Sequence, residues 1–378
     1  MISFSAVIVA ILDLFRKKSK IVFVITVIFL WSILAFTYGD ADESVYISRY
    51  TDPQAWIGHT ELLFALCMSV ASKMGLTFYQ YKAIITGIEL ILICSTIRKM
   101  AKYPNFVLFC YMIVPFALNV TQMRNALSTA IFIYFSRYLF EHEKIGKAIK
   151  LGKHIQFDYT DIMYVIGIML ATLVHAASFI WLVLLVAKKY DVKTCLAFMI
   201  SVNLLLQFAI TPQNITKIIS VVSKAAASRM IPYLTVEYQN SEWRHHSQIL
   251  YVALVGAIIC VIFYLIIKWK KNFNISKDTV TALKINICIL IIFSLMFKYT
   301  QELYRLQEGL FIINYITITN TIKNNDMNST RISARSFGII MLLIVYIAFS
   351  AWFLIYHYLI PTVINPILQN NYLWNIIK

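Results

Sequence analysis

The amino-acid sequence predicts an all-α, polytopic integral membrane protein with a single transmembrane domain over residues 1–378. Hydrophobic residues occupy 60% of the 378 positions and charged residues only 14%. Apolar runs recur along the whole chain, and a helix of roughly 20 apolar residues crosses a bilayer core of about 30 Å. Lipid offers the backbone no hydrogen-bond partner, so such runs fold as helices. We count about 11 to 13 hydrophobic segments.

The charge pattern orients these segments. The formal net charge of +16 is spread over short basic clusters between the apolar runs, among them RKKSK at 16–20, RKMAK at 98–102, KKYDVK at 188–193 and KWKK at 268–271. Short cytoplasmic loops collect Lys and Arg in this way, so we place the clusters inside. No RNA-binding motif accompanies them, and the charge does not indicate a nucleic-acid partner.

The cysteines indicate neither a disulfide framework nor a metal site. All six lie in apolar runs, and no two form a CxxC pair. Cysteines in this setting are typical buried small hydrophobes. We therefore predict a protein without a metal and without a cofactor.

The N-terminal part contains one segment that does not span. Residues 2–15 lack a signal cleavage site and form a retained helix that crosses or lies at the interface. Residues 21–38 cross outward, which makes 39–61 an external loop. The next two apolar segments, 61–76 and 79–97, end at an internal basic cluster, so only one of them crosses. We predict a re-entrant or interfacial helix at 61–76.

A pair of hairpins follows. Residues 104–120 run outward and Arg124–Phe140 return. The apolar run 161–187 has basic clusters on both sides, which favours a hairpin with its tip near His175; a single tilted helix is the alternative. The remaining predicted segments are crossings at 195–210, 247–267, 282–297, 309–321 and 337–357, with external loops at 211–246 and 298–308.

Acidic and aromatic residues gather in the first external loop. Asp40, Asp42 and Glu61 lie there with Tyr46 and Tyr50, which are four residues apart on one helical face. Carboxylates bind sugar hydroxyls, aromatic rings stack on sugars, and one acid can serve as a general base. The alternative is a solvated acidic loop.

Arg124 is a permanent cation inside an otherwise apolar run. Intramembrane ionisable residues are functional candidates, and a planar guanidinium suits a phosphate. The alternative is that Arg124 reaches the outer headgroups. The surrounding polar residues make a larger patch than that requires, and they are Asn119, Thr121, Gln122 and Asn125.

Two further candidates share the outer side. His175 lies in LATLVHAASF, where the alternative is a hydrogen-bonded core histidine. Arg305 is flanked by Glu302 and Glu308 at a spacing of three, where the alternative is a local helix ion pair. Cations and carboxylates on one face predict an anionic lipid-phosphate ligand with a polyhydroxylated partner.

In this order the motifs resemble those of a known family. They are GDADESVYISRY, Glu61 at the start of a helix, PFALNVTQMRNALSTAI, HAASFIWL and YRLQEGLFI. The chain resembles the EpsG-like family of exopolysaccharide polymerases, which is related in function to the Wzy-type O-antigen and capsule polymerases.

The resemblance implies an all-helical membrane glycosyltransferase of the GT-C class at the outer face of the bacterial cytoplasmic membrane. Its substrate would be oligosaccharide repeat units linked to undecaprenyl diphosphate in the bilayer, and its partners a chain-length regulator and a flippase. Arg124 and Arg305 would hold the diphosphate. Among the catalytic candidates, Asp42 or Glu61 would act as the base or hold the acceptor hydroxyl, with His175 nearby. Asp40, Tyr46 and Tyr50 would contact the sugar.

Two other functions compete with this one. A ligase would move finished polymer to another acceptor. A flippase or transporter of the lipid-linked unit would line a central path with charge, and Glu89 is the one residue well placed for that.

Overall fold

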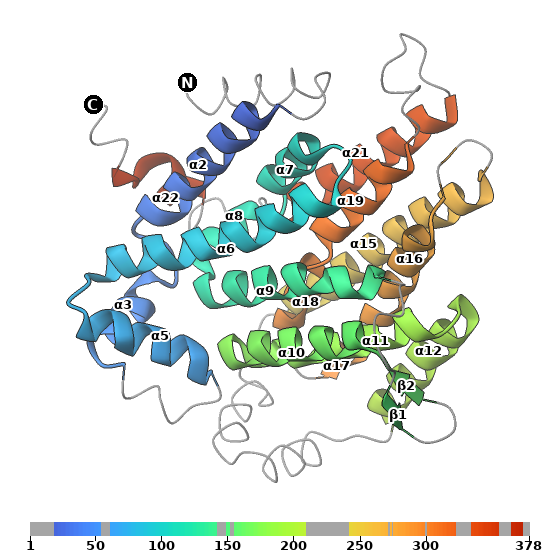
Figure 1. Cartoon of the computed structure of the whole chain (residues 1–378), viewed down its shortest axis with the longest axis horizontal. Helices are drawn as coiled ribbons and strands as arrows, with labels where there is room; N and C mark the ends of the chain where they lie inside the picture. Colours follow the sequence, from blue (N-terminus) through green and yellow to red (C-terminus); the bar gives the residue numbers. More distant parts are fainter. Residues whose placement is uncertain are drawn as a thin grey trace.

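Helices make up nearly all of the described part of the chain in this computed structural model (Figure 1). The structure describes residues 19–53, 61–141, 149–151, 155–208, 242–270, 273, 275–298, 301–322, 334–354 and 364–372. The predicted segment at 2–15 and most of the predicted loop at 211–246 lie outside these residues.

The elements follow one another along the chain in three groups. The first are α2 (Lys20–Phe36), α3 (Glu43–Thr51), α5 (Leu62–Lys73), α6 (Phe78–Met100), α7 (Pro104–Ile113), α8 (Phe116–Thr121) and α9 (Met123–Phe140). Next come the antiparallel strands β1 (Ile149–Leu151) and β2 (Ile155–Phe157), then α10 (Tyr159–Val174), the 3₁₀ helix η1 (Ala176–Val183), α11 (Leu184–Lys189) and α12 (Val192–Phe208). The last are α15 (Glu242–Lys268), α16 (Lys277–Ile289), α17 (Ile292–Lys298), η3 (Gln301–Leu303), α18 (Tyr304–Glu308), α19 (Phe311–Thr321), α21 (Ala334–Leu354) and α22 (Asn365–Gln369).

The predicted crossing at 104–120 is two helices. α7 ends at Ile113 and α8 begins at Phe116, with Pro115 between them. Proline has no backbone N–H and cannot continue a helix. A second break at Gln122 separates α8 from α9. Hydropathy alone does not register such breaks, because the residues on both sides are equally apolar.

The predicted hairpin at 161–187 is confirmed. α10 packs against η1, and the Tyr164 hydroxyl donates a 2.7 Å hydrogen bond to the carbonyl of Trp181. At the base of the hairpin, Lys188 Nζ lies 2.8 Å from Asp161 Oδ1. Asp161 also closes a capping box with Asp158 at the start of α10. The chain therefore reverses at His175.

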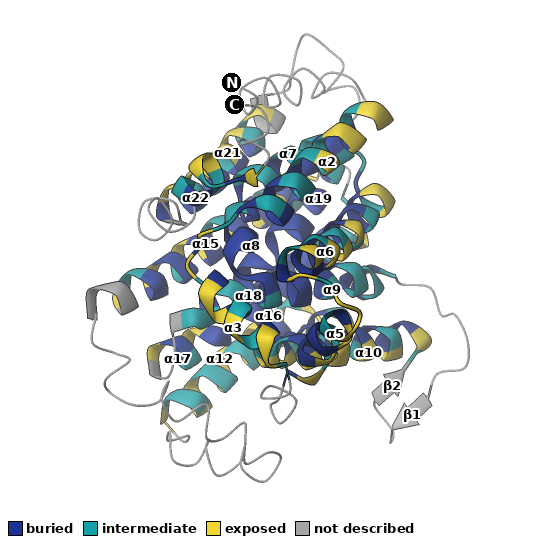
Figure 2. Ribbon diagram, turned by 90° about the vertical axis from the view of Figure 1, so that its left-hand side faces the viewer, coloured by how far each residue is buried: buried dark blue, intermediate teal, exposed yellow. Residues whose placement is uncertain are grey.

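The stretch predicted as a loop at 298–308 is helical in η3 and α18. Tyr304, Leu306, Gln307 and Glu308 are all buried, so α18 belongs to the interior of the bundle. α19 is buried along almost its whole length, and Figure 2 shows the buried residues concentrated through the middle of the bundle around α8, α19 and α16.

Outer helices present apolar faces to their surroundings. On α2 and α6 the exposed residues recur at helical spacing, as Ile21, Ile25 and Ile28 do on one and Ile84, Ile88 and Ile91 on the other. Soluble monomers rarely expose large apolar surfaces to water, whereas such surfaces are favourable in contact with lipid tails.

Two described helices are long and apolar enough to cross a bilayer by length and composition, His246–Lys268 and Lys277–Phe297. The second is interrupted between α16 and α17. Shorter apolar helices include α2, α5, α7, α10 and α12. The full number of crossings stays a prediction.

Candidate active site

Glu61 is the centre of a cluster of predicted site residues. Its carboxylate is buried and directly precedes α5. Oε1 lies 2.9 Å from Nδ1 of His175, and Oε2 accepts a hydrogen bond from a terminal nitrogen of Arg124. One carboxylate thus bridges a guanidinium and an imidazole from separate helices, although the three residues are far apart in the sequence.

Both partners of Glu61 lie at helix ends. Arg124 occupies the first turn of α9, directly after the break at Gln122. His175 is the C-cap of α10, with extended backbone at the point where the hairpin reverses. α9 packs directly against α10, and Figure 1 shows the two side by side, which brings Arg124 and His175 to the same end of the pair.

Tyr46 completes the cluster. Its hydroxyl accepts a hydrogen bond of 3.4 Å from the backbone N–H of Arg124. The Arg124 guanidinium carbon lies 5.8 Å from the centre of the Tyr46 ring, within the range of a cation–π contact. Tyr46 is carried by α3, which packs against α5. The candidate site is therefore Tyr46, Glu61, Arg124 and His175.

The electrostatics of the cluster keep Glu61 ionised. Burial would raise the pKa of its carboxyl, but the hydrogen bond with His175 and the charge of Arg124 outweigh that effect and hold the pKa at about 2. An ionised carboxylate accepts hydrogen bonds only, so Nδ1 of His175 is the donor between them. In the neutral ring this leaves Nε2 as the nitrogen that can take a proton.

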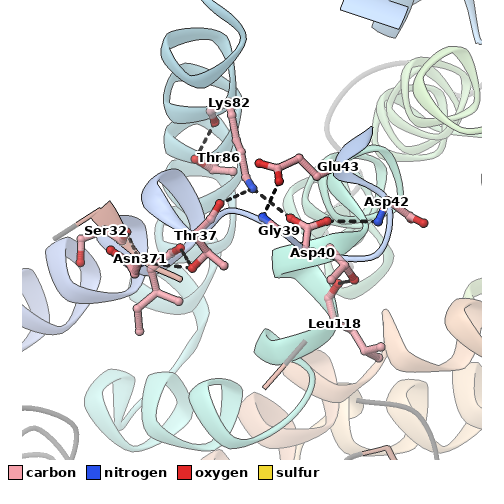
Figure 3. A network of polar contacts seen from close by, with 12 residues as sticks. Ser32, Thr37, Gly39, Asp40, Asp42, Glu43, Lys82, Thr86, Leu118 and Asn371 are labelled. Atoms are coloured by element: carbon pink, nitrogen blue, oxygen red, sulfur yellow. Dashed lines mark hydrogen bonds and ion pairs between the residues drawn. The ribbon is translucent and has the colours of Figure 1, made fainter. Parts of the chain in front are cut away.

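Asp40 lies outside this cluster. Its Oδ2 forms a 3.1 Å ion pair with Nζ of Lys82, and both side chains are almost fully buried (Figure 3). Burial raises the pKa of Asp40, while the adjacent Lys82 ammonium opposes that rise. Asp42 directly precedes α3, and its backbone N–H donates to Asp40 at 3.2 Å. Asp40 and Asp42 thus belong to the structure of the loop that leads into α3.

Tyr50 and Arg305 have other local partners. The Tyr50 hydroxyl donates to the carbonyl of Leu76 at 2.7 Å, and its ring packs on Tyr81 with centroids 5.4 Å apart. Arg305 forms an ion pair with Glu302, as its spacing of three allowed. α18, which carries Arg305, packs against η1, the helix that follows His175.

Three buried charged side chains lie outside the predicted site residues. Lys82 is 2% exposed inside α6. Glu89 accepts a 2.9 Å hydrogen bond from Asn119, which fixes α6 against α8. Glu308 is buried in α18. A charge inside an apolar run was the available signal for each, but it does not identify the partner.

Among the described residues, no three His, Cys, Asp or Glu side chains lie together as a metal ion would require.

Comparison with known proteins identifies the family. A family model described as the EpsG family matches residues 20–362, nearly the whole chain. Comparison with the curated proteins and with the solved structures gave no match. The match includes every residue of the candidate site, and the apolar outer faces of the helices agree with a membrane protein. The chain belongs to the EpsG family of exopolysaccharide polymerases.

Proposed function

We propose that this protein polymerises oligosaccharide repeat units linked to undecaprenyl diphosphate, at the outer face of the bacterial cytoplasmic membrane. The observation that carries the proposal is the Glu61 carboxylate held between Arg124 and His175. Membership of the EpsG family supports polymerisation as the reaction. The basic clusters lie at the end of the bundle away from Arg124 and His175, which supports an outward orientation of the site.

The reaction needs a base for an acceptor hydroxyl and a cation for a diphosphate leaving group. In the proposed step, the hydroxyl oxygen of the incoming unit bonds to the anomeric carbon of the growing chain. The bond from that carbon to the diphosphate oxygen breaks, and the diphosphate leaves with the electron pair. The proton of the hydroxyl passes to Nε2 of His175.

Glu61 has the role of orienting the base. A carboxylate with a pKa of about 2 is a weak base at neutral pH, so it is poorly suited to take the proton itself. Through its bond to Nδ1 it fixes the His175 ring and stabilises the imidazolium that forms, as the acid does in a hydrolytic triad. We therefore assign the base to His175 rather than to Glu61 or Asp42.

Arg124 is the proposed ligand of the diphosphate. Charge grows on the leaving group in the transition state, and a preplaced cation there lowers the barrier. Arg305 is the proposed second cation, because α18 joins η1 through a 3.1 Å hydrogen bond from Trp181 to the carbonyl of Leu306. The Tyr46 ring, beside Arg124, is the proposed stacking surface for the sugar next to the diphosphate.

Cells that lack the protein and carry a variant in its place test the proposal. Cells that carry Arg124→Ala should accumulate single lipid-linked repeats, which a gel of the glycan detects. Arg137→Gln is the matched control: it lies at the other end of α9, stacked 3.9 Å above the Tyr134 ring, and should give normal polymer.

Three other outcomes contradict the proposal. Normal long polymer from Arg124→Ala removes the diphosphate role. Full-length but unattached polymer in cells without the protein indicates a ligase. Intact repeats trapped on the inner leaflet indicate a flippase.

A further inference from the structure

The loop that leads into the site is held by two distant parts of the chain and by the first turn of the helix that follows it. Residues 37–42 connect α2 to α3, the helix that carries Tyr46. Lys82 of α6 donates to the carbonyl of Thr37 at 2.8 Å and to Asp40 at 3.1 Å (Figure 3). The backbone N–H of Gly39 donates to the carboxylate of Glu43 in the first turn of α3. These contacts fix the loop to α6 and to α3.

The third holder is the C-terminal segment that follows α22. The backbone N–H of Tyr38 donates to the carbonyl of Asn370 at 2.8 Å. The Asn371 side chain donates to Thr37 Oγ1 at 3.1 Å and to the carbonyl of Ser32 at 3.4 Å. Asn371 is fully buried by this arrangement, and Figure 3 shows it against Thr37 and Ser32. We call Asn370, Asn371 and Tyr372 the C-terminal clasp.

Aromatic contacts and a glycine extend the clasp. The Tyr372 ring lies 4.6 Å from the Tyr38 ring and 5.4 Å from that of Tyr79, centroid to centroid. Gly39 has a φ of +73°, and a Cβ there would stand 3.0 Å from the Asn370 side chain. Glycine is the residue that adopts this backbone conformation without strain and leaves room for Asn370.

The clasp lies outside the part of the chain that the EpsG family model covers. That match ends at residue 362, and the described C-terminal segment is 364–372. The clasp thus lies outside the matched region and holds a loop within it. Its position matters because the loop passes directly into α3, where Tyr46 contacts Arg124.

We propose that the C-terminal clasp positions Tyr46 over Arg124 and so sets the catalytic rate of the site. The proposal rests on the function proposed above. The clasp touches neither Glu61, Arg124 nor His175 in any contact that the structure describes, so its members are positioning residues. Loosening it should lower the fraction of molecules in which Tyr46 is in place and leave the diphosphate ligand Arg124 unchanged.

Two variants and a matched control test the clasp in the reconstituted protein. Asn371→Ala removes the buried side chain, and a chain ending at residue 363 removes the whole segment. Leu368→Ala is the control, because Leu368 is 60% exposed on α22. The first readout is hydrogen exchange at the amides of residues 38–50, which needs no substrate. We expect faster exchange there in both variants, most of all at the Tyr38 amide of the shortened chain, and no change in the control.

The second readout is the rate of polymer formation from a purified lipid-linked repeat unit. In Asn371→Ala we expect kcat to fall about tenfold with KM within about twofold, since misplacement of a positioning group lowers the rate more than the binding. A synthetic peptide of residues 364–378 should restore the shortened chain, which a general loss of fold would not allow.

The outcomes separate this proposal from the function itself. Unchanged exchange at residues 38–50 in both variants overturns the clasp, whatever the enzyme makes. Faster exchange with unchanged kcat also overturns it, because the loop then moves without effect on the site. If the wild-type protein forms no polymer, the proposed function fails, and the exchange experiment still decides whether the clasp holds the loop.

Discussion

At Glu61, one buried carboxylate has two partners of different chemistry. The carboxylate neutralises the permanent charge of Arg124 and holds the ring of His175 in one orientation. Charge-assisted hydrogen bonds of this kind are shorter and stronger than neutral ones. Removing the charge of Glu61 therefore affects both the diphosphate ligand and the base.

Glu61→Gln should lower kcat by up to about 10⁴-fold, the loss that a carboxylate-to-amide change causes in the orienting acid of a hydrolytic triad. Glutamine has nearly the same shape but cannot neutralise Arg124 or stabilise an imidazolium. Polymer formation by the reconstituted variant measures the effect. Glu141→Gln is the control, since Glu141 pairs with Lys99 at 3.4 Å near the protein surface and should keep full activity. Equal activity of both variants would contradict the role of Glu61.

The low pKa of Glu61 also predicts how its contribution to stability depends on pH. The pKa in the folded protein is about 2 and its ordinary value is 4.5. Because the folded value is the lower one, the contribution is fully present above pH 4.5 and is lost as the pH falls towards 2. Its size is on the order of 3 kcal/mol, at about 1.4 kcal/mol for each pKa unit.

Unfolding of wild-type protein and of Glu61→Gln in detergent measures this contribution. The difference between their free energies of unfolding should be constant from pH 7 to pH 5 and shrink below pH 4.5. A difference that stays constant down to pH 2.5 would show that Glu61 is not held ionised by its neighbours.

At the scale of the helices, the close packing of α9 on α10 brings Arg124 to His175. Gly167 of α10 makes this approach possible, because a Cβ at that position would stand 2.1 Å from the ring of Phe135 on α9. No real side chain tolerates such a contact, so the two helices would have to separate. The separation would move Arg124 on α9 away from His175 at the end of α10.

Gly167→Ala should therefore lower both stability and activity. Overpacking of a core of this kind costs about 1 to 3 kcal/mol in the free energy of unfolding. Gly338→Ala is the matched control, because a Cβ there meets nothing within 4 Å. That change in α21 should be neutral or raise the stability by about 0.5 to 1 kcal/mol. Equal stability of the two variants would contradict the close packing of α9 on α10.

In the whole molecule, the candidate site and the basic clusters lie at opposite ends of the bundle. α6 runs from Phe78, near α3 and α5, to the basic residues Arg98 and Lys99 at its far end. We predict that the first end faces outward and the second inward.

Labelling with a membrane-impermeant maleimide tests this orientation in a background without the six native cysteines. Ala41 and Lys99 are both exposed, so each can carry a single cysteine. Ala41→Cys should react in intact cells, and Lys99→Cys should react only after the membrane is opened. The reverse pattern would mean that the site faces the cytoplasm. The site could not then act on a lipid-linked substrate at the outer face.

The sequence predicted the members of the site better than their pairing. Arg124, His175 and Glu61 were identifiable because charged or titratable groups in apolar runs are rare, and Tyr46 because of its acidic, aromatic loop. Asp40 was assigned to the sugar, but it pairs with Lys82, a contact between residues 42 apart that no local pattern reveals.

The helices were predicted better than their ends. Hydropathy located α6, α9, α10 and α21, because long apolar runs have one stable form in lipid. It joined α7 to α8 across Pro115 and read η3 and α18 as a loop, since short buried helices take their stability from packing. The C-terminal clasp could not be predicted, because it depends on contacts between the two ends of the chain.

Reconstitution with a purified undecaprenyl-diphosphate-linked repeat unit is the decisive experiment for the proposed polymerisation. We expect wild-type protein in liposomes to convert the unit into a ladder of longer polymer and to release undecaprenyl diphosphate. Arg124→Ala and His175→Ala, inserted to the same level, should leave the unit unchanged. Absence of polymer from the wild-type protein, or a normal ladder from either variant, would contradict the account.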